Sequence, residues 1–183
     1  MALAALPILV LAGFVGRLHQ PKASGTVFEK KKRIMGQEYE RSPALGLLNL
    51  AWEYSEAAKK VAREPKLKNV SRFLACRSVE LALKAFLRAK GWEESELRQI
   101  GHNLQAALRE AEKAGLGESC PVERVFRTHL IILNTWYEKK DFEYPFVAPE
   151  LRTVWTRRVM NTFIKGADNL RGRIQGFVVE QIK

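Results

Sequence analysis

The stretch that decides the fold is VSRFLACRSVELALKAFLRAKG, residues 70–91. Its apolar side chains recur at steps of three and four and cover more than one face, which is typical of a helix buried on several sides. Gly91 follows the last periodic residue, a position where helices commonly end in a left-handed conformation. The stretch therefore predicts a central helix that other helices surround.

The segments before and after this stretch repeat the helical pattern. Ser42 and Pro43 are an N-cap residue followed by proline at the first helical position, and Pro65 ends the helix that they open. Three more helices are expected over residues 97–115 with a break near Gly101, from Pro121 onward and from Pro149 onward. No alternating strand pattern is present, so the sequence predicts an all-α fold, an up-and-down helical bundle of about five helices.

The positive charge of the chain is unevenly distributed. Its 183 residues carry a formal net charge of +11, which favours acidic partners such as RNA, DNA, an anionic membrane face or an acidic protein. Residues 1–34 contribute +5 of this charge and share no pattern with the helices that follow. We therefore expect a non-domain N-terminal arm at 1–41, the bundle at 42–175 and a C-terminal tail at 176–183.

Within the arm, residues 2–16 are apolar but too few to cross a membrane. A helix of that length reaches about 22 Å, against about 30 Å of hydrocarbon. The segment also lacks the basic start and the cleavage site of a signal peptide. Three interpretations remain: a leader peptide, an amphiphilic arm, or an over-extended start with the true initiator at Met35. We favour the last, because Met35 lies just before the first well-patterned helix.

Cys76 and Cys120 stand 44 positions apart, with no histidine cluster beside either. This spacing predicts neither a zinc site nor a disulfide framework, and it fits a reducing compartment. We expect a cytoplasmic protein without a metal or a cofactor.

The common phosphate-loop, dinucleotide, zinc-protease and nucleophile-elbow signatures are absent from the sequence. One candidate binding site is formed by Arg77, Glu80 and Lys84, which steps of three and four place on one stripe of the central helix. Unpaired charge is costly to bury, so these charges must be paired or must face a polar surface. Either Glu80 and Lys84 form an ordinary ion pair on a partly exposed face, or the stripe is part of a surface that faces a ligand.

A second candidate binding site is the run GHNL at residues 101–104. Free backbone N–H groups at a helix start favour an anion, and His102 and Asn103 are polar groups beside them. The alternative is that one of these two side chains caps the helix.

A third candidate site, a catalytic one, pairs Arg124 with His129. Metal-independent RNA cleavage needs a group that binds the phosphate and a group that activates the 2′-hydroxyl. A guanidinium can do the first, and an imidazole, which titrates near neutrality, can do the second. His129 also falls on the apolar stripe of its helix, so the alternative is a packed core histidine.

Several short runs together carry a family resemblance: SVELALKAFLRAK at 78–90, then Gly91, GHNL at 101–104, LNTWY at 133–137 and FEYP at 142–145. In HEPN domains a helix with an E-x-x-L-K-A core is followed by a glycine turn and a histidine-leucine helix start, often with an aromatic-tyrosine-proline segment later. The sequence resembles this family over roughly residues 45–170, most specifically over 78–104.

The resemblance implies a helical bundle that dimerises, often encoded beside a small nucleotidyltransferase in prokaryotic toxin–antitoxin or defence loci. Many members are metal-independent endoribonucleases that use an R-x4-6-H motif from each protomer. Arg124 and His129 match that spacing, but Val125 stands where active members commonly have a polar residue. Other members bind nucleotides or partner proteins.

From these features we expect a HEPN-like module that binds a nucleotide, RNA or a partner protein such as a nucleotidyltransferase. The alternatives are the endoribonuclease itself and a non-catalytic structural adaptor. A homodimer is expected through the fourth or fifth helix, which carry Trp136, Tyr137, Trp155 and Phe163, because aromatic residues often anchor interfaces.

Overall fold

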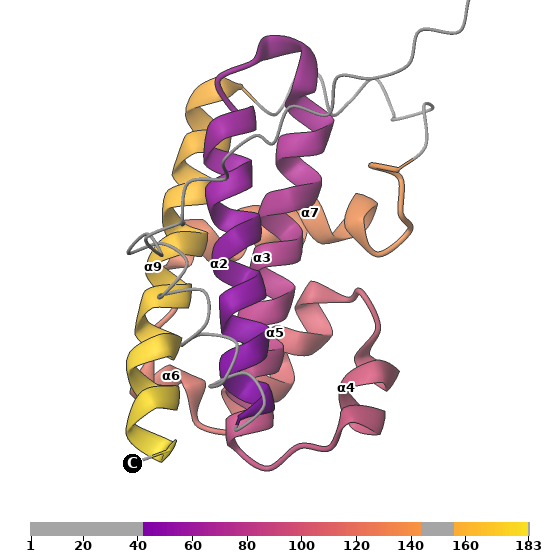
Figure 1. The fold of residues 1–183 in the computed structure, drawn as a ribbon. Helices are drawn as coiled ribbons and strands as arrows, with labels where there is room; N and C mark the ends of the chain where they lie inside the picture. Colours follow the sequence, from indigo (N-terminus) through magenta and orange to yellow (C-terminus); the bar gives the residue numbers. More distant parts are fainter. Residues whose placement is uncertain (1–41, 144–155, 183) are drawn as a thin grey trace, which may run out of the picture.

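The computed structural model describes residues 42–143 and 156–182. The expected N-terminal arm, Met35, Trp155 and the helix start at Pro149 lie outside these residues. Every regular element within them is a helix, and the prediction of an all-α fold is confirmed. The elements (Figure 1) are α2 (Pro43–Val61), the 3-10 helix η1 (Pro65–Leu67), α3 (Lys68–Ala89), α4 (Glu94–Ile100), α5 (Leu104–Lys113), α6 (Leu116–Ser119), α7 (Arg124–Tyr137) and α9 (Arg157–Ile182).

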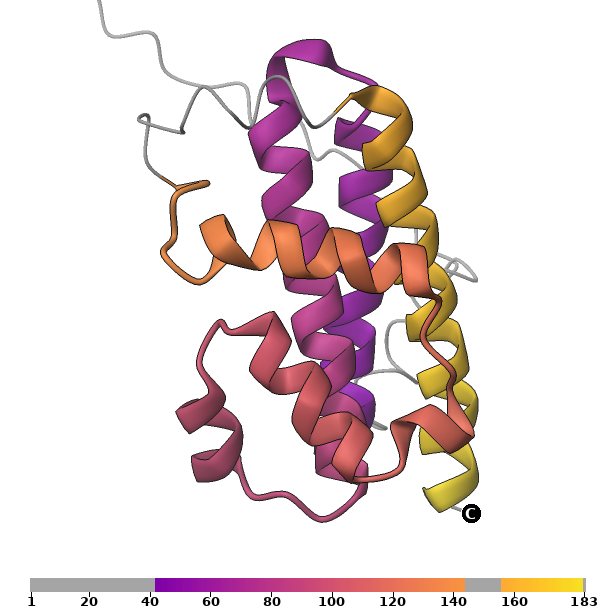
Figure 2. The same ribbon diagram turned by 180° about the vertical axis from the view of Figure 1, so that it is seen from behind.

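Three long helices form the body of the protein. Helices α2, α3 and α9 pack against one another along a common axis, and α7 crosses α3 and α9 on one side (Figure 2). Helix α5 packs beside α7 on α3. The site described below lies where α3, α5 and α7 come together.

Helix α3 is the central helix, as its sequence pattern predicted. Its fully buried apolar side chains face α2, α5 and α9, and they include Cys76, Val79, Leu83, Phe86 and Leu87. Gly91, just after the helix, has a φ of +93°, a conformation that glycine adopts without strain. The expected break at Gly101 is also present, between α4 and α5, and there φ is +61°.

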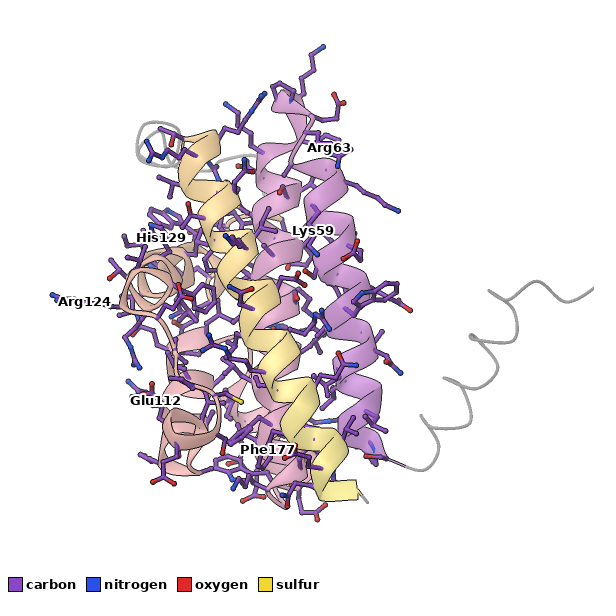
Figure 3. All side chains as sticks on the ribbon, turned by 90° about the vertical axis from the view of Figure 1, so that its left-hand side faces the viewer. Lys59, Arg63, Glu112, Arg124, His129 and Phe177 are labelled. Carbon is purple, nitrogen blue, oxygen red and sulfur yellow. The ribbon has the colours of Figure 1, made fainter. Side chains whose placement is uncertain are left out.

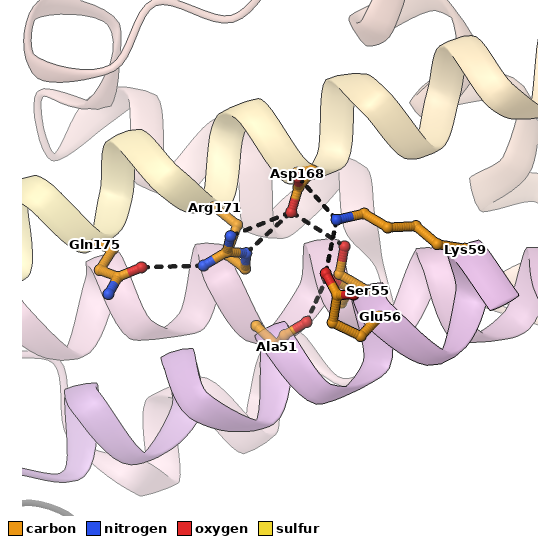
Figure 4. A network of polar contacts seen from close by, with 8 residues as sticks. Ala51, Ser55, Glu56, Lys59, Asp168, Arg171 and Gln175 are labelled. Carbon is orange, nitrogen blue, oxygen red and sulfur yellow. Dashed lines mark hydrogen bonds and ion pairs between the residues drawn. The ribbon is translucent and has the colours of Figure 1, made fainter. Parts of the chain in front are cut away.

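Polar contacts fix how α2 lies against α9 (Figure 4). The Lys59 ammonium on α2 lies 2.9 Å from one Asp168 carboxylate oxygen, and the Ser55 hydroxyl donates to the other over 3.3 Å. Arg171 holds the same carboxylate from within α9 at 3.1 Å. Burial alone would raise the pKa of Asp168, but the hydrogen bonds from Lys59 and Arg171 outweigh it and lower the pKa.

Helix α9 includes residues 176–182, which the sequence pattern had assigned to a C-terminal tail. Gly172 and Gly176 weaken the helical signal, since each costs about 1 kcal/mol relative to alanine in a helix. Ile174 and Val178 are nevertheless fully buried, and the Phe177 ring lies 4.8 Å from that of Phe86 on α3. Burial of an aliphatic side chain contributes about 1.5–3 kcal/mol, so packing outweighs the glycines.

Among the helices of residues 42–143 and 156–182, none combines the length and the hydropathy needed to cross a bilayer.

Candidate functional site: a buried carboxylate and its basic partners

The site is built around the carboxylate of Glu80, whose side chain is only 1% exposed. An ionised carboxylate at such depth must be paired and hydrogen-bonded. One of its oxygens accepts hydrogen bonds from Arg77 and from Lys84, each over 2.8 Å. The other accepts from the Tyr137 hydroxyl over 2.6 Å. The i to i+4 pair of Glu80 and Lys84 expected from the spacing is therefore present, with two further partners.

His102 completes the group, which we call the Glu80 cluster: Arg77, Glu80, Lys84, His102 and Tyr137. Its Nδ1 lies 3.1 Å from the carboxylate oxygen that Tyr137 also contacts. Because an ionised carboxylate only accepts hydrogen bonds, this contact requires a hydrogen on Nδ1. The Arg77 guanidinium lies 3.5 Å from the same nitrogen, so the arginine and the histidine are neighbours.

The cluster changes the proton affinities of its members. Burial alone would raise the pKa of Glu80, but hydrogen bonds from Lys84 and Tyr137 and the charges of Lys84 and Arg77 outweigh it, and the pKa is lowered. Burial and the charge of Glu80 raise the pKa of the Tyr137 hydroxyl far above its usual range. The carboxylate is therefore charged at neutral pH, and Tyr137 remains a proton donor to it.

Backbone groups place His102 beside the carboxylate. Lys84 donates a second hydrogen bond, over 2.8 Å, to the carbonyl oxygen of Gly101. Asn103 is the N-cap of α5, because its side-chain oxygen accepts from the backbone N–H of Ala106 over 2.8 Å. Asn134 on α7 accepts from the N–H of Leu104 over 2.6 Å. The capping interpretation of Asn103 is thus the one the geometry supports, and two N–H groups at this helix start are already satisfied.

The structure brings together four of the five residues that the sequence predicted as binding residues. Arg77, Glu80 and Lys84 from α3 meet His102, while Asn103 supports the loop that carries it. Tyr137 and Asn134 were missed as site residues. Both fall in the LNTWY run at 133–137 that contributed to the family resemblance. That run is the sequence feature that could have identified them as site residues.

Exposure decides which members of the cluster could touch a ligand. The side chain of Lys84 is 13% exposed, that of Arg77 is 28% and that of His102 is 41%. Two cations surround one carboxylate, so the cluster carries at least one excess positive charge. Arg77 and His102 are the members that face outward. Arg77 can donate hydrogen bonds to an anionic group such as a phosphate, and His102 can donate through Nε2 to the same group when both of its ring nitrogens carry hydrogen.

Arg124 and His129 do not form a comparable site within one chain. Five positions along a helix correspond to about 140° around its axis. Figure 3, which looks along α7, shows the Arg124 side chain extending away from the bundle. His129 is half-buried, and burial lowers its pKa, which keeps the imidazole neutral at pH 7.

Other chemistry has little support in the described part of the chain. No group of three or more His, Cys, Asp or Glu side chains with the arrangement of a metal site occurs in residues 42–143 and 156–182. Cys76 lies one turn before Glu80 on α3, but burial and the charge of Glu80 raise the pKa of its thiol well above the usual value. A buried, protonated thiol is a poor nucleophile.

No family model matches the sequence, and neither a curated protein nor a solved structure matches it.

Proposed function

We propose that this chain is a HEPN-like helical module that binds a phosphate-bearing ligand, a nucleotide or RNA, through Arg77 and His102. The observation that carries the proposal is the contact of both residues with the buried Glu80 carboxylate. A buried anion that accepts hydrogen bonds from two partly exposed basic side chains fixes the orientation of both. Such preorganised donors bind phosphate at a lower entropic cost than mobile surface side chains do.

The fold agrees with this proposal. Helix α2 runs antiparallel to α3 and α9, which run parallel to each other, and this packed helical arrangement is compatible with a HEPN-like bundle. The E-x-x-L-K-A run and the GHNL run, which gave the family resemblance, supply Glu80, Lys84 and His102 to one cluster. A prokaryotic toxin–antitoxin or defence role, with a nucleotidyltransferase partner, belongs to the same proposal and rests on the resemblance.

Binding can be tested by fluorescence anisotropy with a labelled single-stranded RNA and with a labelled adenine nucleotide. We expect Arg77→Gln and His102→Asn each to weaken binding by about tenfold, the scale of one lost charge-assisted hydrogen bond. Arg98→Gln is the matched control, because Arg98 is exposed on α4 and pairs only with Glu94 among the described residues. Equal affinities for all three variants and the wild type would rule out the Glu80 cluster as the ligand site.

A second candidate function is metal-independent RNA cleavage by Arg124 and His129, and one observation favours it in a dimer. Val125, Thr128 and Ile131 are exposed at steps of three along α7 and form an uncharged face beside Arg124. Val125 is 56% and Ile131 is 45% exposed. A second copy of the chain on this face would bring its own Arg124 and His129 near those of the first.

If the protein binds neither RNA nor nucleotide, the remaining candidate function is that of a structural adaptor.

A further inference from the structure

One end of the bundle carries a cluster of exposed positive charge. The connection between α2 and α3 and the first turn of α9 lie at this end in two opposite views (Figures 1 and 2). We call it the basic end, and its exposed cations are Lys60, Arg63, Lys66, Lys68, Arg157 and Arg158. Glu64 is the single acidic residue in the segments 60–70 and 156–160.

The charge of these cations is not neutralised by the described residues. Within the part of the chain that the structure describes, none of the six forms an ion pair. By contrast, Lys59, one residue before Lys60, pairs with both Glu56 and Asp168. The basic end therefore differs from the neighbouring flank of α2, where charge is neutralised within the protein.

Two aliphatic side chains lie among the cations. Leu67 is 41% exposed at the end of η1, and Val70 is 46% exposed in the first turn of α3. Leu67 is the N-cap residue of α3 and Val70 is its third residue, so both belong to the turn where η1 passes into α3. Lys66 and Lys68 flank Leu67 in the sequence. The basic end thus presents apolar side chains surrounded by positive charge at a projecting turn.

This combination distinguishes two classes of anionic partner. Proteins that bind single-stranded nucleic acid combine cations with aromatic side chains on which bases stack. The two segments of the basic end, residues 60–70 and 156–160, contain no aromatic residue. A bilayer with anionic lipids attracts Lys and Arg to its headgroups and accepts aliphatic side chains at the acyl boundary. We propose that the basic end docks on an anionic membrane surface, with Leu67 and Val70 entering the interface and the cations contacting lipid phosphates.

The full-length protein can be tested by co-sedimentation with vesicles of phosphatidylcholine alone or with phosphatidylglycerol. We expect binding only to the anionic vesicles, and weaker binding at high salt because salt screens the charges. Lys66→Glu with Lys68→Glu should lower the partition coefficient at least about 25-fold, at about fivefold per cation near an anionic surface. Leu67→Ser with Val70→Ser should lower it about tenfold at unchanged net charge.

The matched control is Arg109→Glu with Lys139→Glu, which changes the net charge equally at exposed positions away from the basic end. This variant should keep most of the binding, and thermal melts should show that all variants fold. A wild type that does not bind anionic vesicles overturns the proposal. The proposal is also overturned if the control variant loses as much vesicle binding as the Lys66→Glu, Lys68→Glu variant, or if the basic end binds RNA but not vesicles.

Discussion

The Tyr137 hydroxyl donates a 2.6 Å hydrogen bond to the buried Glu80 carboxylate, although the two residues lie 57 positions apart in the chain. The contact joins the last residue of α7 to the middle of α3. His102, on the loop between α4 and α5, contacts the same carboxylate oxygen. One oxygen atom therefore connects three parts of the chain, and its environment should control both stability and ligand binding.

Replacing Tyr137 by phenylalanine removes this donor and leaves the ring in place. Because the lost hydrogen bond goes to a charged and buried group, we expect a loss of about 1.5–3 kcal/mol in the free energy of unfolding. Urea denaturation followed by circular dichroism measures it. Tyr54→Phe is the control, since Tyr54 is only partly buried and packs at the edge of the core. A change in Tyr137→Phe no larger than in Tyr54→Phe would show that the hydrogen bond contributes little.

The lowered pKa of Glu80 makes stability depend on pH in the acid range. A carboxyl whose pKa is lower in the folded than in the unfolded state binds fewer protons when folded. It therefore stabilises the protein fully at pH values above its pKa in the unfolded state, and this stabilisation is lost as the pH falls through its pKa in the folded state. For Glu80 the ordinary value is 4.5, and for Asp168, whose pKa is also lowered, it is 3.8. We expect the free energy of unfolding to fall as the pH drops through about 4.5 and below.

This pH dependence can be assigned to individual residues with amide variants. Glu80→Gln should lower stability at pH 7 and make the acid limb of the stability curve shallower. Asp168→Asn should do the same to a smaller degree, because Asp168 is more exposed and its pairs are screened by water. Urea denaturation at several pH values between about 3 and 7 gives the comparison. An acid limb as steep in Glu80→Gln as in the wild type would contradict the assignment.

The local parts of the Glu80 cluster could be predicted from the sequence, and the long-range parts could not. Glu80 and Lys84 are one helical turn apart, so their ion pair follows from helix geometry alone. His102 and Tyr137 reach Glu80 from 22 and 57 positions away. No periodicity encodes such a contact, since it depends on how α7 crosses α3. The family resemblance named the runs that contain these residues, without showing that they meet.

The fold shows the same division. Proline and glycine punctuation predicted where α2, α3 and α4 end, because these residues act on their own backbone. The aromatic residues of α7 and α9 were expected at a dimer interface, and here the expectation was wrong for two of them. Tyr137 is 3% exposed and Phe163 is fully buried. Apolar residues at core and interface positions have the same helical spacing, so the pattern cannot separate them.

Gly166 on α9 allows α7 to approach closely. A Cβ added there would meet the ring of Phe126, whose Cγ atom would be only 2.9 Å away. Phe126 stacks on Phe163 with ring centroids 5.1 Å apart, so it has little room to move. We expect Gly166→Ala to destabilise the protein by about 1–3 kcal/mol. Gly172→Ala, where an added Cβ meets nothing within 4 Å, should instead stabilise it by about 0.4–1 kcal/mol. Thermal melts of the two variants test the contrast.

The uncharged face of α7 predicts a dimer, and charged side chains introduced on this face should dissociate it. We expect the wild type to have about twice the monomer mass of 20.9 kDa in light scattering. Val125→Glu with Ile131→Glu should give a monomer, because burying an unpaired carboxylate in an interface is strongly unfavourable. Both positions are exposed in the chain itself, so the double variant should keep its melting temperature. A wild type that is monomeric at every concentration would exclude any site shared between two copies.

If the dimer cleaves RNA, we expect cleavage in the presence of EDTA with 2′,3′-cyclic phosphate ends. Burial lowers the pKa of His129, so the neutral imidazole at pH 7 can take the proton of the 2′-hydroxyl. His129→Ala should then lower the rate by about 10² or more, the usual scale for a lost general base, with RNA affinity nearly unchanged. Arg124→Ala should weaken both binding and turnover, because a phosphate contact acts in the ground state and the transition state alike.

The Val125→Glu, Ile131→Glu monomer should lose cleavage while it retains binding at the Glu80 cluster. Cleavage that survives in both His129→Ala and the monomer would place the reaction elsewhere and leave His129 as a core residue.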